Sequence, residues 1–135
     1  MNNYTEILRT YNLKATPQRL AILNTISNYG HINIDKLYKE VKVKFNSISL
    51  ATIYKNTNAM ISNMLLQEVK IPNSKSVYEI TKAEHSHLLC KNCKDVIDVD
   101  IDIKDITKNL STEYNFAVLH SDLVLTGICE RCQTK

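Results

Sequence analysis

The sequence of 135 residues contains no run of about 18 apolar residues, the length that a membrane-spanning helix requires. Its start, MNNYTEILRT, lacks the basic region and apolar run of a secretory signal. We therefore expect no membrane-spanning segment and a cytoplasmic location. There is no internal repeat, no low-complexity segment and, with only two glycines, no Gly/Ser-rich linker. An apolar fraction of 44% beside 23% charged residues indicates a globular chain rather than a disordered one.

The net charge is low, but the charged residues are unevenly distributed. The net charge is only +3. Residues 1–80 hold ten Lys and Arg against five Asp and Glu, whereas residues 81–135 hold seven against nine. The first part therefore carries +5 and the second −2, which suggests two parts with different tasks. A mild basic excess is by itself weak evidence for nucleic-acid binding.

The first part has the apolar spacing of helices. Ile7, Leu8 and Tyr11 share one face of a short first helix. Three more helices are predicted to begin after N-cap residues, which are Thr16, Asn33 and Ser49. Two short strands follow, residues 65–71 and 76–80, around the turn signal PNSK. This order predicts a winged helix-turn-helix domain over residues 1–82, whose recognition helix, residues 50–63, enters the DNA major groove.

The second part, residues 83–135, is predicted to be a small α/β domain, so the fold class is α+β. VIDVDI alternates apolar and acidic residues as a half-buried strand does. DIKDITKNL is typical of a helix capped by Asp102, and FAVLHSDLVLTGIC predicts one or two further strands. The boundary between the two domains is marked only by charge and apolar pattern.

Four cysteines occur in two CxxC pairs, Cys90 with Cys93 and Cys129 with Cys132. Two such pairs can supply the four thiolates of a tetrahedral structural zinc site. A metal would also stabilise a C-terminal unit of about 50 residues, whose core is small. A thioredoxin-type redox motif is disfavoured because neither pair opens a helix after a strand in a βαβ unit. Two unrelated cysteine pairs remain the alternative.

If the cysteines close one zinc site, His85 and His87 belong elsewhere. Placed two residues apart on an extended segment, they point to the same face and can bind one ion. Oxygen or nitrogen ligands for a second site with Fe(II) or Mn(II) are available nearby, namely Glu79, Asp98 and His31. The alternatives are that His85 and His87 join Cys90 and Cys93 on zinc, and that His31 is a partly exposed helix-cap residue. His120 shares a strand face with Phe116 and Val118, which is typical of a core histidine.

Four segments together resemble the ferric uptake regulator family, in order and over almost the whole chain. They are TPQR from Thr16, SLATIYKN from Ser49, HSHLLCKNC from His85 and CERC from Cys129. The resemblance implies a homodimer, with a winged-helix DNA-binding domain and an α/β dimerisation domain in each chain. It assigns the four cysteines to structural zinc. It also implies a regulatory Fe(II) or Mn(II) site that joins the two domains through His31, Glu79, His85, His87 and Asp98.

The resemblance also implies which residues contact DNA and which branch of the family the chain is similar to. Tyr54 and Lys55 match DNA-reading positions, and Lys14 matches a residue that approaches the minor groove. We add Arg19, Thr52 and Asn56 as expected DNA contacts. Asp98 matches the aspartate typical of the peroxide-sensing branch, and Ser86 replaces an acid that iron-uptake members often use for an additional metal site. Glu79 stands where the usual peroxide-sensor pattern has Asp.

The expected function is therefore a metal-dependent repressor that binds palindromic double-stranded DNA. Peroxide would oxidise His31 or His85 in the Fe(II) form, which consumes a ligand, so the protein is not expected to be an enzyme. One alternative is an iron-responsive regulator without peroxide sensing. Another is a zinc-stapled protein-interaction or RNA-binding module. A zinc hydrolase is disfavoured by the two CxxC pairs, and a zinc deaminase needs a Glu where His87 stands.

Overall fold

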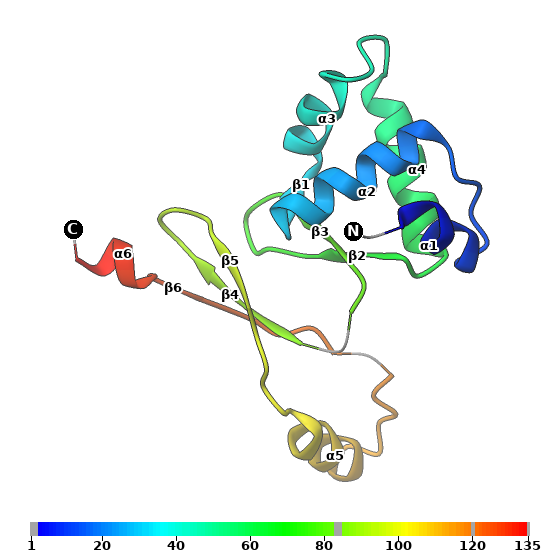
Figure 1. Ribbon diagram of the computed structural model, residues 1–135. Helices are drawn as coiled ribbons and strands as arrows, with labels where there is room; N and C mark the ends of the chain where they lie inside the picture. Colours follow the sequence, from blue (N-terminus) through cyan, green and yellow to red (C-terminus); the bar gives the residue numbers. More distant parts are fainter. Residues whose placement is uncertain (1–2, 83–84, 120, 135) are drawn as a thin grey trace. The chain divides into compact units, whose positions relative to one another are not determined.

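The computed structural model describes residues 3–82, 85–119 and 121–134, drawn in colour in Figure 1. The chain divides into two compact units, Met1–Lys82 and Ala83–Lys135. The first contains α1 (Tyr4–Thr10), α2 (Pro17–Tyr29), β1 (Ile32–Asn33), α3 (Ile34–Lys42), α4 (Leu50–Ser62), β2 (Leu66–Val69) and β3 (Val77–Ile80). The second contains β4 (Ser86–Cys90), β5 (Val96–Val99), α5 (Lys104–Glu113), β6 (Val124–Gly127) and α6 (Glu130–Gln133). Over the described ranges, no helix is long and apolar enough to cross a bilayer.

The helices of the first unit begin at the expected caps. The side-chain oxygens of Thr16, Asn33 and Ser49 each accept a hydrogen bond from the backbone N–H three residues on, at 3.2, 2.9 and 3.1 Å. Each cap satisfies one of the N–H groups that the first helical turn leaves without a partner. Gly30 follows α2 with a positive φ of 75°, which glycine adopts more readily than other residues. The predicted starts of α2, α3 and α4 are therefore confirmed.

The core of the first unit lies among its helices and the β2–β3 hairpin. Leu8, Ile22, Leu23, Ile26, Leu37 and Ile53 are fully buried in it. Each such side chain stabilises the fold by roughly 1.5–3 kcal/mol through its burial. One strand was not expected: β1 pairs antiparallel with β3, so the sheet has the order β1-β3-β2. His31 directly precedes the two residues of β1, which pair with β3.

The second unit is a three-stranded sheet with β4 in the middle, in the order β5-β4-β6 (Figure 1). β4 pairs antiparallel with β5 and parallel with β6, and α5 lies in the connection between β5 and β6. The C-terminal strand prediction is confirmed for β6, whereas residues 116–119 form no strand. His120 lies outside the residues that the structure describes. The short helix α6 was not expected.

Candidate metal centres and DNA-contact residues

The four cysteines come together at one end of the second sheet. Cys90 ends β4, Cys93 lies in the turn that leads to β5, and Cys129 and Cys132 follow β6. Parallel pairing of β4 with β6 puts Cys90 opposite Gly127, two residues before Cys129. The pairing of these two strands therefore joins CxxC pairs that are more than thirty residues apart in sequence.

The cysteine geometry fits tetrahedral zinc. Four sulfurs bound at about 2.3 Å in a tetrahedron lie about 3.8 Å from one another. The Sγ atoms of Cys93 and Cys129 are 3.8 Å apart, and the four Sγ atoms lie within 4.8 Å of one another. The cysteines form no disulfide. The structure therefore brings together the four sulfur donors expected for zinc, at a spacing that suits the ion. His85 and His87 are not part of this cluster.

Local hydrogen bonds already favour thiolate at this cluster. The backbone N–H groups of Cys129 and Cys93 donate to Sγ of Cys90, at 3.4 and 3.5 Å, and lower the pKa of Cys90 to about 6. In contrast, the neighbouring sulfur of Cys129 raises the pKa of Cys132 to about 12. Four adjacent thiols cannot all lose their protons unless a cation compensates the charge. A zinc ion bound by the four cysteines would supply that charge.

An arginine beside the cluster was not expected. The Arg131 side chain contacts Sγ of Cys93 at 3.8 Å and forms an ion pair with Asp95. Its guanidinium contributes positive charge next to a site where four thiolates and one zinc ion carry a net negative charge. The signal in the sequence is its place inside the second CxxC, where it follows Cys129 by two residues.

Two of the five expected regulatory ligands, His31 and Glu79, belong to the first unit. Glu79 lies on β3, the middle strand of its sheet, and only 1% of its side chain is exposed. Nε2 of His31 lies 2.8 Å from Oε2 of Glu79. The other carboxylate oxygen, Oε1, accepts a hydrogen bond from Nε2 of Gln67 on β2. A nitrogen and an oxygen at this spacing suit neighbouring positions around a six-coordinate ion, which lie about 3 Å apart.

The other three expected ligands belong to the second unit. His87 on β4 is the cross-strand partner of Asp98 on β5. Nε2 of His85 and Nε2 of His87 lie 3.4 and 3.3 Å from Oδ1 of Asp98. The two imidazole rings are in edge contact, with centroids 4.5 Å apart. The expectation that residues 85 and 87 point to the same face is therefore confirmed, and a carboxylate faces both.

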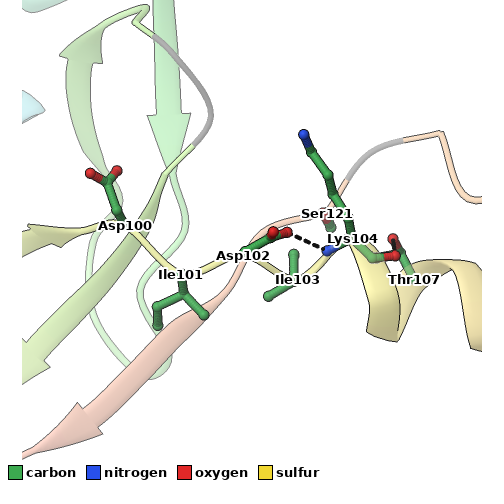
Figure 2. Close-up of a pocket in the computed structure, with 7 residues that line it drawn as sticks. All are labelled: Asp100, Ile101, Asp102, Ile103, Lys104, Thr107 and Ser121. Atoms are coloured by element: carbon green, nitrogen blue, oxygen red, sulfur yellow. Dashed lines mark hydrogen bonds between the residues drawn. The ribbon is translucent and has the colours of Figure 1, made fainter.

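A hollow of about 430 Å³ lies elsewhere in the second unit, between the end of β5 and the first turn of α5 (Figure 2). Its lining includes Asp100 and Asp102 but none of the expected metal ligands. Figure 2 shows that the Asp102 carboxylate faces the start of α5, where it accepts a hydrogen bond from the Lys104 N–H at 3.0 Å. The N-cap of α5 is Ile103, which forms no side-chain cap hydrogen bond, so the prediction that Asp102 is the capping residue was wrong by one position. Asp102 bonds the first helical N–H from the residue before the N-cap.

The expected DNA-contact residues divide into exposed and internally bonded ones. Lys14, Tyr54 and Lys55 are exposed. Asn56 is buried, and its Nδ2 donates to the Thr52 carbonyl within α4 at 3.0 Å. The Arg19 side chain donates to Oδ1 of Asn56 at 3.1 Å and to the carbonyl of Lys14 at 3.0 Å. Arg19 thus connects the segment before α2 with α4.

Comparison with known proteins agrees with this architecture. Residues 10–126 match the ferric uptake regulator family. The peroxide operon regulator of Bacillus subtilis is 30% identical over 132 residues, covering 96% of this chain and 91% of that protein. The crystal structure of the Campylobacter jejuni peroxide stress regulator is 34% identical with a TM-score of 0.70, covering 97% of this chain and 100% of that one. The Vibrio cholerae ferric uptake regulator is 30% identical with a TM-score of 0.76, covering 94% and 100%.

The winged-helix first unit, the cysteine cluster and these matches define the class as metal-responsive transcriptional regulators. The chain belongs to the ferric uptake regulator family.

Proposed function

We propose that the protein is a homodimeric repressor that binds palindromic double-stranded DNA when a regulatory Fe(II) or Mn(II) is bound, and that it senses hydrogen peroxide. Residues 1–82 serve as the DNA-binding domain and residues 83–135 as the dimerisation domain. The resemblance to peroxide regulators over nearly the whole chain supports this assignment. Lys14, Tyr54 and Lys55 contact DNA together with Thr52, whereas Asn56, which is buried, was expected as a contact and instead supports this surface through its hydrogen bond with Arg19.

One observation carries the regulatory part of the proposal: the candidate ligands are sorted by chemistry. All four sulfur donors lie in one cluster, which suits permanent zinc. The remaining donors, on His31, Glu79, His85, His87 and Asp98, are nitrogen and oxygen atoms. Imidazole and carboxylate together suit Fe(II) and Mn(II), which bind more weakly than zinc in most sites. A metal held in this way can leave the protein.

We propose that all five residues bind the same ion. Each unit then contributes part of the ligand set, and metal binding couples the orientation of the DNA-binding domain to that of the dimer. The metal favours the arrangement in which two α4 helices can enter the major groove about one helical turn apart. Without the metal, the two domains lose this coupling and DNA is released.

Peroxide acts by consuming a ligand. Iron(II) bound at the site supplies the redox chemistry that lets peroxide react there. Overall, peroxide transfers one oxygen atom to a ring carbon of His31 or His85 and leaves as water, a two-electron oxidation of the imidazole. An oxidised ring is a poorer ligand, so the site loses affinity for the metal and the repressor leaves its DNA. Because each event alters the protein itself, there is no turnover.

A DNA-binding experiment tests this function. Duplexes are selected from a random pool with the Mn(II)-loaded protein, and binding is then measured with zinc-loaded protein alone, with added Mn(II) and with anaerobic Fe(II). We expect binding only when a second metal is present. Peroxide should release DNA from the Fe(II) form and leave the Mn(II) form bound. DNA binding that is unaffected by either metal would overturn the proposal.

The same experiment separates a second candidate, an iron-responsive regulator that does not sense peroxide. Glu79 favours this candidate, because the usual peroxide-sensor pattern has Asp at that position. It predicts metal-dependent binding that a chelator reverses and that peroxide leaves unchanged in both metal forms.

A further inference from the structure

We propose that Gln67 is a positioning residue for the regulatory metal, because it holds the Glu79 carboxylate so that one oxygen, Oε2, is presented as a ligand. The inference rests on the proposed role of Glu79 and His31 as metal ligands. The sequence offers no direct signal for it, since a glutamine is not itself a metal ligand here.

The hairpin register places Gln67 and Glu79 together. They are cross-strand partners in the β2–β3 ladder, so their side chains leave the sheet on the same face. β3 is the central strand of its sheet, between β1 and β2. Glu79 pairs with Gln67 on one side, and its neighbour Tyr78 pairs with Ile32 of β1 on the other. Its backbone therefore has little freedom, and the direction of its carboxylate depends on side-chain contacts.

The chemistry of the pair fixes which atoms meet. An ionised carboxylate can only accept hydrogen bonds, so Gln67 must turn its amide nitrogen, Nε2, toward Oε1 of Glu79. The second oxygen, Oε2, lies 2.8 Å from Nε2 of His31. The two carboxylate oxygens therefore have different neighbours. Gln67 holds one, and the other lies beside the imidazole nitrogen that is expected to bind the same ion.

This arrangement determines how Glu79 can bind a metal. A glutamate has more rotatable bonds than the aspartate of the usual peroxide-sensor pattern, so ordering it costs more conformational entropy. Gln67 restricts the carboxylate before the metal arrives and disfavours rotation that would offer both oxygens to the ion. Residues that orient ligands in this way typically change metal affinity by about 10- to 100-fold when they are replaced.

The test measures Mn(II) affinity of the full-length, zinc-loaded protein, with free Mn(II) read from its EPR signal. Gln67→Met keeps an unbranched side chain of similar length and removes the donor. We expect its dissociation constant for Mn(II) to rise about 10- to 100-fold. Zinc content should stay at the wild-type value. Glu68→Met is the matched control, because it puts the same side chain on the same strand at the adjacent exposed position, and it should bind Mn(II) as the wild type does.

A second readout separates positioning from damage to the fold. If Gln67 acts through the metal, the Gln67→Met protein should recover wild-type affinity for the selected duplex at saturating Mn(II). A structural defect in the β2–β3 hairpin would lower DNA affinity at every metal concentration. Should the Met variant fail to fold, Gln67→Val removes the donor with a residue that favours strands and has no polar side-chain atom.

The outcomes distinguish this inference from the proposed function. Wild-type protein that binds no second metal beyond zinc would refute the regulatory site itself. Wild-type protein that binds Mn(II), together with a folded Gln67 variant whose affinity lies within twofold of it, would refute the role of Gln67 alone.

Discussion

At the scale of single residues, the run from His85 to Cys90 shows how neighbours in sequence take different tasks. His85 and His87 face Asp98 across the β4–β5 pair, whereas Cys90 contributes to the cysteine cluster. Spacing and ligand chemistry were sufficient to predict this division, because four thiolates complete a zinc site without imidazole. The partner of Glu79 could not be predicted in the same way. A one-residue slip in the register of the hairpin would place a neighbour of Gln67 opposite Glu79. The Gln67 side chain would then lie on the other face of the sheet, away from Glu79.

Arg19 permits a prediction at this scale. Its side chain joins the Lys14 carbonyl to Asn56 on α4, so it should hold Lys14 in place for DNA. We expect Arg19→Met to weaken duplex binding by about 10-fold, in line with the 1–3 kcal/mol of one specific contact. In a double-mutant cycle with Lys14→Ala, the two losses should be clearly less than additive. Binding measured by fluorescence anisotropy checks this, and fully additive losses would show that Arg19 acts on its own.

At the scale of elements, the sequence predicted best what local chemistry determines. The caps of α2, α3 and α4 are set by Thr16, Asn33 and Ser49 within one helical turn, and they were predicted correctly. The two-residue strand β1 was missed, because it depends on pairing with β3 more than forty residues away. The helix α6 was also missed, since its four residues are too few to show an apolar period.

A zinc ion held by the two CxxC pairs would link the end of β4 to the segment after β6, and this leads to a second prediction. Among the described residues of the second unit, only two apolar ones are buried, Leu89 and Cys90. The stability of this unit must therefore depend strongly on the metal. Cys129→Ser should lose zinc and unfold this unit, while the first unit keeps its helices. Zinc content, together with amide exchange resolved by segment, measures both effects. Thr126→Ser on β6 is the control and should retain zinc; a Cys129→Ser protein with full zinc content would refute the four-cysteine assignment.

At the scale of the whole molecule, the apolar surface of the second unit points to self-association. No residue of α5 is buried, and Ile106, Leu110 and Tyr114 are 58%, 45% and 67% exposed. An apolar surface of this kind is typical of a protein–protein interface rather than of a monomer. A second copy of the chain is the partner that the family relationship supports.

The third prediction follows from that surface. Leu110→Glu places a charge in the proposed dimer interface, where burial without a partner is unfavourable, and should shift the protein toward monomer. Light scattering coupled to size-exclusion chromatography measures the mass, and binding to a palindromic duplex should weaken in parallel. Asn109→Glu puts the same charge on the adjacent position of α5 and should remain dimeric. If Leu110→Glu is as dimeric as the wild type, the interface lies on another surface.

The proposed sensing mechanism depends most on a histidine ligand that peroxide consumes, and peptide mass spectrometry tests this directly. Zinc-loaded protein is prepared with Fe(II) or with Mn(II), treated anaerobically with hydrogen peroxide and digested. We expect one added oxygen atom on a peptide that contains His31 or His85, in the Fe(II) sample only. Release of DNA by peroxide with oxidation confined to cysteine peptides would contradict it, because the zinc cluster and not the regulatory site would then be the sensor.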